Sequence, residues 1–391
     1  MLTTTFPRWK DDVEPPFVFE LCRRLSDFEV HVIAPHAPKA ATEEAMDGVH
    51  VHRFRYAPEK LETLAFNGGI AANLKRSPWK YLLLQGFLLG MFFRAMQVAR
   101  KFDIHLIHAH WIIPTGLVGA ALKELLPGTN SLVLTAHGGD LHRLRGKLFE
   151  KMRRWAANEA DCVSLVSHDL ELSARREGWQ PGELIVAPMG VEMQRLFTPA
   201  RRSGEKKTIV FAGRLVAKKG PLHLIEAVAL LKESIPDCRL LVAGDGPLRE
   251  QLLERTKILG LTESVRFTGM YALEDLPDVL RSGEVVVLPF DIAEDGDAEG
   301  LGLTALEAMA CGVPVIVGDV PAIHDVVEHE VTGLIVDPRD PDALTQEILR
   351  LLRSPELRSS LAEAGRDHAK RYFDWGVCAQ RYTDIFQRLN D

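Results

Sequence analysis

Cysteine is scarce and scattered in this 391-residue chain. The five cysteines form no Cys-x-x-Cys pair, and their number is odd (Cys22, Cys162, Cys238, Cys311, Cys378). A disulfide framework needs paired cysteines and a structural zinc site needs closely spaced ones, so the sequence favours neither. This usage is typical of a reducing compartment, and we expect a cytoplasmic protein.

Long hydrophobic runs are also lacking. Residues 1–16 contain no apolar stretch of the kind found in a secretory signal. The longest apolar segment, residues 81–93, is interrupted and shorter than a membrane-spanning helix. We expect it to be a helix packed on the first domain, with membrane insertion as the alternative. Any contact with an anionic membrane is then expected to be peripheral, at the inner face.

The composition shows no bias towards disorder. Hydrophobic residues make up 46% of the chain and charged residues 26%, which is typical of a soluble globular protein long enough for two domains. Residues 1–200 hold 24 of the 47 Lys and Arg and 22 of the 54 Asp and Glu, so the first half is slightly basic and the second acidic. We expect no nucleic-acid partner. The basic stretch 143–154 is either a solvated helix face or a surface that attracts anionic headgroups.

Short β-rich runs alternate with helical stretches along the whole chain, which predicts an α/β protein with doubly wound parallel sheets. A polar break at 198–207 lacks apolar periodicity and is the expected linker. We expect a first domain over 1–200, a second over 205–372 and a last helix over 373–391. The expected strands are 28–34, 49–54, 104–109, 132–136, 162–166 and 184–187, then 208–212, 239–243, 265–268, 285–289, 313–317 and 333–336.

The acidic segment between residues 290 and 303 follows one of these strands and precedes a helix. Gly300 and Gly302 remove side chains where a ligand could approach the backbone. The free N–H groups at the start of the helix, near Thr304, favour an anion such as phosphate. Glu299 and Glu307 lie on either side of this point. On their spacing alone, they could equally be a surface-loop residue and a solvated helix residue.

A basic turn follows the strand at 208–212. Arg214 offers two parallel donors and Lys219 a compact charge, a combination suited to a diphosphate leaving group. Taken alone, such a turn is more often solvated surface. The two motifs together indicate a nucleotide-sugar enzyme.

With these motifs the chain resembles the group 1 (family 4) retaining glycosyltransferases, which have the GT-B fold of two Rossmann-like domains facing a cleft. The resemblance covers almost the whole chain, through Gly213-Arg214-Leu215 with Lys219-Gly220, the segments 242–247 and 265–269, the two glutamates and 306–316. It implies that Arg214 and Lys219 hold the diphosphate, Glu307 the ribose and Glu299 the sugar. Backbone after Gly269 is expected to meet the base. The expected donor-binding residues are Gly213, Arg214, Lys219, Gly269, Met270, Glu299, Gly300, Leu301, Gly302, Leu303, Thr304 and Glu307.

Histidines stand out in the first half. His137 ends an expected strand and precedes two glycines, and in the family a histidine at this place lies by the transferred sugar. Asp140 either shares that acceptor side or only caps the next helix. His108 and His110 lie on the same face of an expected strand, but no further ligand completes a metal site there, so we expect no metal. We assign His110 to the acceptor side.

The expected activity is that of a retaining hexosyltransferase. It needs no metal or other cofactor and moves a hexose from a UDP- or GDP-sugar to a glycan or lipid-linked acceptor, in polysaccharide or glycolipid synthesis. His137, Arg214, Lys219 and Glu299 are the expected catalytic residues. The alternatives are a phosphorylase or epimerase of similar fold and a noncatalytic nucleotide-sugar-binding protein. The chain departs from the family at residues 5–16, where many members have a Gly-Gly loop near the donor phosphate.

Overall fold

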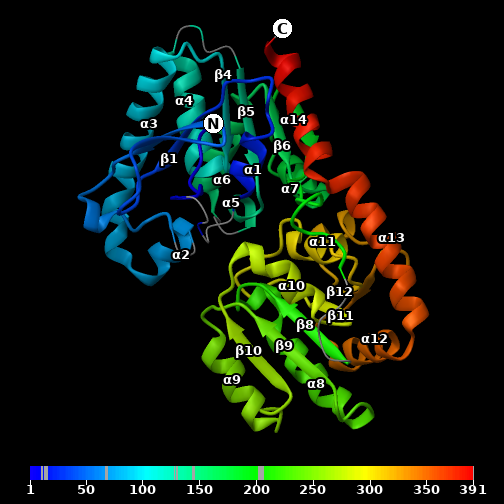
Figure 1. Cartoon of the computed structure of the whole chain (residues 1–391). Helices are drawn as coiled ribbons and strands as arrows, with labels where there is room; N and C mark the ends of the chain where they lie inside the picture. Colours follow the sequence, from blue (N-terminus) through cyan, green and yellow to red (C-terminus); the bar gives the residue numbers. More distant parts are fainter. Residues whose placement is uncertain are drawn as a thin grey trace. The chain divides into compact units, whose positions relative to one another are not determined.

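Each half of the chain builds its own sheet covered by helices, as the computed structural model shows (Figure 1). The structure describes residues 1–9, 12, 16–66, 69–126, 128, 131–142, 146–200 and 207–390. Residues 1–190 and 378–391 form one compact unit and residues 191–377 a second. Residues 201–206 of the expected linker, Arg143 and Arg145 of the basic stretch, and residues 10, 11 and 13–15 of the departing loop lie outside the described residues.

The sheet of the first unit joins two groups of strands through the first residues of the chain. The backbone N–H of Leu2 donates to His108 at 2.8 Å and its carbonyl accepts from His110 at 2.9 Å, while Thr3 donates to Ile33 at 3.1 Å. Residues 1–3 therefore lie between β1 and β4. The strand orders are β2-β3-β1 and β4-β5-β6-β7, with β1 (His31–Pro35), β2 (Glu43–Met46), β3 (Val49–Phe54), β4 (Leu106–His110), β5 (Ser131–Ala136), β6 (Cys162–Leu165) and β7 (Glu183–Val186).

The expectation of a wholly parallel sheet in this unit is wrong at one edge. β2 pairs antiparallel with β3, and its residues are exposed or half-buried. A sheet edge that faces solvent needs no second buried face, so a short polar hairpin strand fits there.

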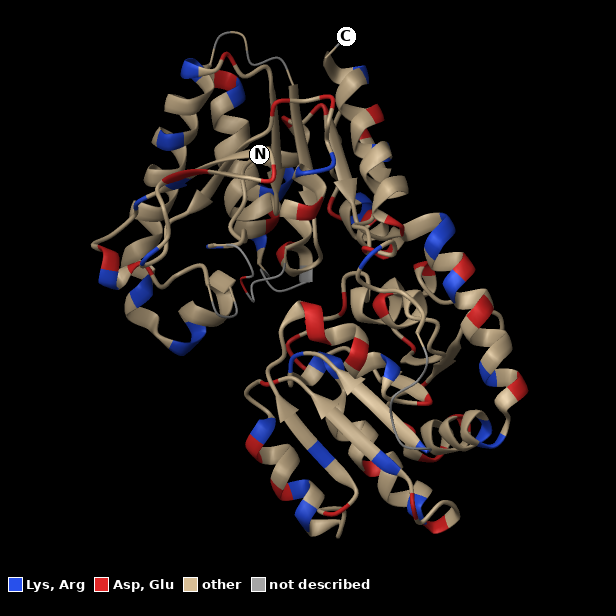
Figure 2. Cartoon of the chain, in the orientation of Figure 1, with Lys and Arg blue, Asp and Glu red and all other residues tan. Residues whose placement is uncertain are grey.

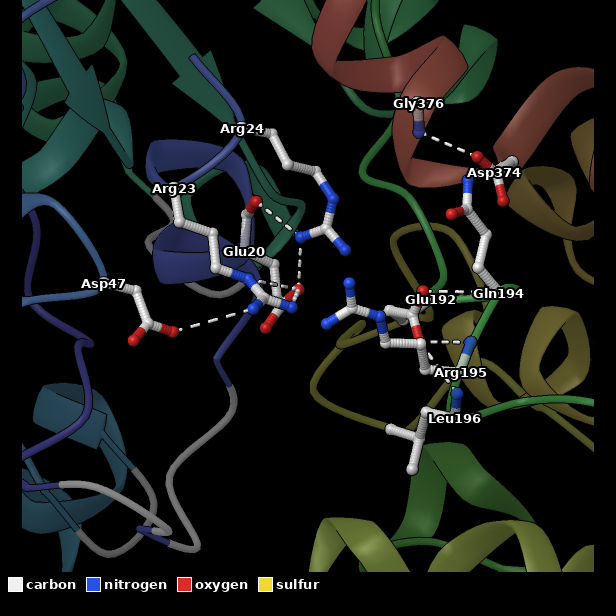
Figure 3. A network of polar contacts seen from close by, with 10 residues as sticks. All are labelled: Glu20, Arg23, Arg24, Asp47, Glu192, Gln194, Arg195, Leu196, Asp374 and Gly376. Carbon is white, nitrogen blue, oxygen red and sulfur yellow. Dashed lines mark hydrogen bonds and ion pairs between the residues drawn. The ribbon is translucent and has the colours of Figure 1, made fainter. Parts of the chain in front are cut away.

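Helices cover both faces of this sheet: α1 (Phe17–Cys22), α2 (Gly69–Arg76), α3 (Leu83–Lys101), α4 (Leu117–Leu125), α5 (Gly139–His142), α6 (Lys147–Asn158) and α7 (His168–Arg176). At α1, Glu20 accepts hydrogen bonds from Arg23, at 2.7 Å, and from Arg24 (Figure 3). The last helix, α14 (Trp375–Asn390), belongs to this unit from Cys378 onward. Its Tyr382 hydroxyl donates to the carbonyl of Ala187 at 3.0 Å.

The apolar segment 81–93 is part of a longer helical stretch than expected. A short 3-10 turn (Pro78–Leu82) runs directly into α3, and within the 24 residues Pro78–Lys101 a window of 18 residues reaches a mean hydropathy of 1.5. By length and composition alone this stretch could cross a membrane, so the prediction that the segment is too short is wrong. One face of α3 nevertheless packs on β1 and β3 through Leu83, Phe87 and Met91.

The second unit has one parallel sheet in the order β10-β9-β8-β11-β12-β13. Chain order reverses between β8 and β11, which makes this the topological switch point of a doubly wound sheet. At the start of the unit, Glu192 accepts backbone hydrogen bonds from Gln194, Arg195 and Leu196 and closes a turn (Figure 3). The strands are β8 (Thr208–Ala212), β9 (Arg239–Ala243), β10 (Val265–Gly269), β11 (Val285–Leu288), β12 (Val315–Gly318) and β13 (Leu334–Val336).

The core of this unit comes from strands that are buried on both faces. β8, β11 and β12 are fully buried along their lengths, which explains their continuous apolar sequences. The covering helices are α8 (Pro221–Ser234), α9 (Arg249–Ile258), α10 (Leu276–Arg281), α11 (Leu303–Ala310), α12 (Pro341–Arg353) and α13 (Pro355–Phe373).

Candidate functional site

The polar residues predicted for the donor gather at the switch point of the second unit. β8 and β11 pair directly, with Ile209 opposite Val285 and Val210 opposite Val286. The chain leaves β8 into residues 213–220 and leaves β11 into residues 289–302. Both loops therefore start from the same edge of the sheet, where ligands of doubly wound folds bind.

Glycines let these loops come together. A Cβ on Gly220, which has a φ of +62°, would lie 1.8 Å from the carbonyl oxygen of Pro289. A Cβ on Gly244 would lie 1.9 Å from the carbonyl oxygen of Gly213. No other residue type fits such approaches without moving the backbone, so the two glycines fix the separation of the loops.

Lys219 and Glu299 form the centre of the site. Their side chains meet at 2.8 Å, and each is only 14% exposed. The Lys219 ammonium also lies 4.7 Å from the centre of the Phe290 ring. Burial alone would raise the pKa of Glu299, but the charges of Lys219 and Lys218 outweigh it and lower the pKa to about 2. Glu299 is therefore an anion at neutral pH, held beside a cation.

Lys218 makes a second ion pair with the same acidic loop. Its ammonium contacts Asp297 at 3.2 Å and donates to the carbonyl of Ala298 at 2.9 Å. The backbone carbonyl of Lys218 accepts from Asp291 at 2.9 Å. These contacts fix the residues that precede Glu299. Lys218 therefore holds the acidic loop in place, whereas Lys219 contacts Glu299.

The helix α11 begins immediately after this loop. Gly302 is its N-cap, with a φ of +92°, and no side chain caps the helix there. This φ is strained for a residue with a side chain, and a Cβ on Gly302 would lie 2.8 Å from Cδ1 of Ile323, which would have to move. The first-turn N–H groups of Leu303 and Thr304 thus retain the positive end of the helix dipole.

Glu307 lies one turn further along α11. Burial raises its pKa to about 7, against a smaller opposing effect of the Lys219 charge. The same carboxylate helps to raise the pKa of Tyr271, after burial as the main cause. Lys219, Glu299, Glu307 and Tyr271 therefore belong to one electrostatic neighbourhood.

The other predicted donor residues lie around this centre. Arg214 is exposed on the loop after β8, behind Gly213, and Met270 is 66% exposed beyond Gly269 at the end of β10. Gly300 and Leu301 are buried, whereas Leu303 and Thr304 are half-buried. No described contact joins Glu299 and Glu307 directly.

The first unit holds its predicted residues at the carboxyl ends of β4 and β5. Nδ1 of His110 and Nε2 of His137 lie 3.0 Å apart, and Trp111 and Phe17 pack against the His137 ring. Burial lowers the pKa of His137 to about 3. Burial, together with the neighbouring histidines, also lowers the pKa of His110 far below its usual range. Both rings are neutral at physiological pH.

Asp140 fastens the loop that follows β4. Its Oδ2 accepts from the backbone N–H of Ile112 at 2.8 Å, and the Arg153 guanidinium donates to its carbonyl at 3.1 Å. Its Oδ1 is buried without a hydrogen-bond partner among the described atoms. Asp140 lies within α5 and holds a neighbouring loop. His110 is fully buried behind His137 and positions that ring.

Sequence reasoning missed four contributors. Lys218 and Asp297 lie far apart in sequence, and only the pairing of β8 with β11 brings their loops together. Phe290, whose ring centre lies 4.7 Å from the Lys219 ammonium, directly follows the expected strand 285–289. Tyr271 follows the predicted Met270 directly, and its position beside an expected base-binding segment was the one available signal.

Comparisons with known proteins identify the family of the chain. Residues 193–368 match the family described as glycosyl transferases group 1, and residues 16–190 match the glycosyl transferase 4-like domain. A GDP-mannose-dependent alpha-(1-6)-phosphatidylinositol monomannoside mannosyltransferase of Mycolicibacterium smegmatis is 30% identical over 74% of this chain and 79% of its own.

Two solved structures share the fold across nearly the whole chain. Sucrose-phosphate synthase from Thermosynechococcus elongatus has a TM-score of 0.81 at 23% identity, covering 99% of this chain and 98% of its own. The Anabaena protein HepE, solved in complex with UDP, has a TM-score of 0.75 at 18% identity over the same shares. Both unit architectures therefore correspond to the GT-B fold, as predicted.

Proposed function

Because the chain belongs to the group 1 glycosyltransferases, we propose that it is a retaining hexosyltransferase that uses a nucleoside diphosphate sugar and needs no metal. The proposed acceptor is a hydroxyl of a glycan or a lipid-linked molecule. The observation that carries the proposal is the buried Lys219–Glu299 ion pair at the switch point, beside the uncapped start of α11.

The charges of this site suit a departing diphosphate. The Lys219 ammonium and the first-turn N–H groups of α11 supply fixed positive charge where negative charge develops on the leaving group. Arg214, exposed on the same loop, adds a planar guanidinium that can bind phosphate oxygens in pairs. Such groups do the electrostatic work that a divalent cation does in other transferases.

The acidic residues suit the neutral parts of the donor. Glu299 is ionised and acceptor-only, so it can accept hydrogen bonds from sugar hydroxyls while its pairing with Lys219 keeps it oriented. Glu307 accepts from the ribose hydroxyls. His137, neutral and held by His110, positions a hydroxyl of the transferred sugar. Attack on the face that the diphosphate leaves gives retention, with the diphosphate itself accepting the proton from the acceptor hydroxyl.

The names of similar proteins limit which donors and acceptors we propose. The mycobacterial relative is named for GDP-mannose and a phosphatidylinositol mannoside, and the Anabaena neighbour was solved with UDP. We therefore propose a UDP- or GDP-hexose as donor and favour a lipid-linked acceptor, in glycolipid or polysaccharide synthesis at the cytoplasmic face of a membrane.

A donor panel tests this proposal. The protein is incubated with UDP-glucose, UDP-N-acetylglucosamine and GDP-mannose, with and without lipid extracts, in EDTA, and release of nucleoside diphosphate is followed. We expect one donor to be turned over in EDTA, faster with extract, and Arg214→Ala and Lys219→Ala to lose most of this turnover. Unchanged turnover in both variants would contradict the assignment. The anomeric configuration of the product, read by NMR, tests retention.

The same panel separates the alternative activities. A phosphorylase would need free phosphate, an epimerase would convert the donor sugar without releasing nucleoside diphosphate, and a noncatalytic sensor would bind donor without any turnover.

A further inference from the structure

The outer face of α3 is apolar although it faces away from the protein. Leu82 is 83% exposed, Leu89 55% and Phe93 61%. Their spacings of seven and four residues place them in one stripe along the helix. Trp79 and Tyr81, 47% and 59% exposed, lie with Leu82 in the 3-10 turn Pro78–Leu82 that leads into α3. We call these five residues the α3 outer face. Contiguous exposed apolar residues of this kind mark a binding surface.

The segment that builds this face carries charge of one sign, and among its cations Arg94 pairs with Glu43 of β2. Residues 63–102 contain six Lys and Arg and no Asp or Glu. Lys75, Arg76, Arg100 and Lys101 are exposed at the two ends of the stripe, and none of them forms an ion pair within the described part of the chain. The blue segments of α2 and α3 in Figure 2 show this basic character. An exposed apolar stripe flanked by unneutralised cations matches the boundary between acyl chains and anionic headgroups.

The opposite face of α3 is already committed to the protein core. Phe87 and Met91 are fully buried there. A Cβ on Gly86 would lie 2.4 Å from the carbonyl oxygen of Tyr56, and one on Gly90 would lie 2.5 Å from that of Arg55. The helix backbone therefore lies directly on the segment after β3. Crossing a bilayer would require the helix to abandon this packing, whereas lying flat on a bilayer would not.

We propose that the α3 outer face docks the protein onto an anionic phospholipid bilayer, with α3 lying in the plane of the membrane interface. This surface goes beyond the proposed glycosyl transfer, because docking needs none of the donor residues. A second copy of the chain is a poor occupant, since two such basic faces would repel each other. The apolar stripe inserts among the headgroups, and the flanking cations pair with lipid phosphates.

Vesicle flotation tests the docking surface. The full-length protein is mixed with vesicles of phosphatidylcholine alone or of phosphatidylcholine with phosphatidylglycerol. We expect flotation only with the anionic vesicles, and release of the protein by high salt, because a peripheral helix is held partly by charge. A protein that does not float, or that floats equally with neutral vesicles, would overturn the proposal. Binding that resists both salt and carbonate would indicate a helix that crosses the bilayer and would also overturn it.

Two sets of variants locate the surface. Lys75→Gln with Lys101→Gln is expected to weaken binding to anionic vesicles by roughly 30-fold, since each basic residue near the surface contributes about fivefold. The matched control, Lys257→Gln with Lys370→Gln, removes two exposed lysines of the second unit and should leave binding unchanged. Equal loss in both pairs would mean that only total charge matters, and would overturn the proposal.

Leu89→Gln with Phe93→Gln is expected to weaken binding by at least about tenfold. Its control is Leu172→Gln, a 53% exposed leucine of α7. A further variant, Leu148→Gln, probes the rival basic helix α6, where this side chain is 68% exposed. Loss of flotation in Leu148→Gln but not in the α3 variant would assign docking to α6 and overturn the proposal. Thermal unfolding and donor turnover without vesicles should remain normal in every variant, which separates failure of docking from failure of folding or of the proposed activity.

Discussion

The carboxyl ends of the two sheets hold polar groups in opposite states. In the second unit, Lys219 and Glu299 are charged and paired at 2.8 Å, and Lys218 pairs with Asp297 at 3.2 Å. In the first unit, burial lowers the pKa of His137 to about 3 and keeps the ring neutral. Fixed cations suit a charged leaving group, and a neutral ring suits a hydroxyl. The contrast therefore predicts that the second unit governs binding of the diphosphate, and that the first unit adds a neutral contact that helps Glu299 to orient the sugar.

The largest expected effect comes from Lys219→Ala. The change removes the ammonium from the leaving group and leaves Glu299 as a buried anion that repels the diphosphate. We expect kcat/KM to fall by about 1,000-fold, the scale seen when one preorganised electrostatic group is lost. The measurement is release of nucleoside diphosphate from the preferred donor.

Two further variants sharpen this result. Adding Glu299→Gln to Lys219→Ala removes the uncompensated anion and should recover donor binding but not turnover. Lys257→Ala, on the exposed side of α9, should behave as wild type. If kcat/KM of Lys219→Ala fell by less than about tenfold, the Lys219–Glu299 pair would not take part in the proposed mechanism.

The second effect is on stability and concerns Glu307. Burial raises its pKa from 4.5 in the unfolded chain to about 7 in the folded protein. The folded state therefore binds this proton more tightly, so ionisation of Glu307 costs stability as the pH rises from about 4.5 to about 7. At about 1.4 kcal/mol per pKa unit, the full cost above pH 7 is about 3 kcal/mol. Glu307→Gln should thus be more stable than wild type at pH 8, with little difference at pH 4.5.

Urea unfolding of wild type and Glu307→Gln across this pH range measures that difference. Comparing the two proteins removes the contribution of the buried histidines, whose lowered pKa values act in the opposite direction. Glu254→Gln, at an exposed position of α9, is the control. A difference between wild type and Glu307→Gln that stays constant with pH would show that Glu307 is not held in its protonated form.

The sequence predicted the strands that carry an apolar run and missed β2, which carries none. The segments 208–212 and 239–243 were predicted to the residue, because each is largely apolar: β8 is buried along its whole length, and β9 is buried at Leu240, Val242 and Ala243. β2 has the sequence Glu-Glu-Ala-Met at an exposed edge and carries no such signal. Local pattern also could not show where α3 ends, since Arg94 and Gln97 interrupt the apolar residues that follow the segment 81–93.

The candidate site was predictable where its residues lie close together in the chain. Glu299, Glu307 and the start of α11 belong to one segment of loop and helix, so a possible anion site beside two carboxylates follows from general properties of helix termini, whereas the roles of the two glutamates come from the family resemblance. The contact of His110 with His137 depends instead on the register of β4 and β5, which places His110 opposite Thr135. Residues 27 positions apart have no local pattern that reveals such a contact. That is why His110 could be placed on the right face of its strand without its partner being known.

His137→Ala tests the role of the neutral histidine in the first unit. In the proposed mechanism the ring positions a hydroxyl and carries no charge, so we expect kcat to fall by about 30-fold while the KM for the donor changes little. Because the pKa of His137 lies near 3, protonation of this ring should not shape the activity between pH 5 and pH 8. His137→Asn and wild type should therefore show pH profiles of the same form. His105→Ala, at an exposed histidine of the same unit, is the control. A large rise in donor KM instead would contradict the division of tasks between the units.

Lys218→Ala should have the smallest effect, because Lys218 fastens the loop without facing the donor. Loss of its contacts with Asp297 and Ala298 frees the residues before Glu299. We expect the donor KM to rise about fivefold with kcat nearly unchanged, because a partly buried ion pair contributes about 1 kcal/mol, which corresponds to about a fivefold change in affinity. Asp297→Asn should give a similar loss, and the double variant should be no worse than either alone, since both remove one interaction. The matched control is Lys207→Ala. Lys207 forms an ion pair with Asp237 away from the switch point, and the two side chains are 42% and 68% exposed. If Lys218→Ala lowered kcat as strongly as Lys219→Ala, both lysines would act on the leaving group. Lys218 would then have a direct role in catalysis and would not only hold the acidic loop in place.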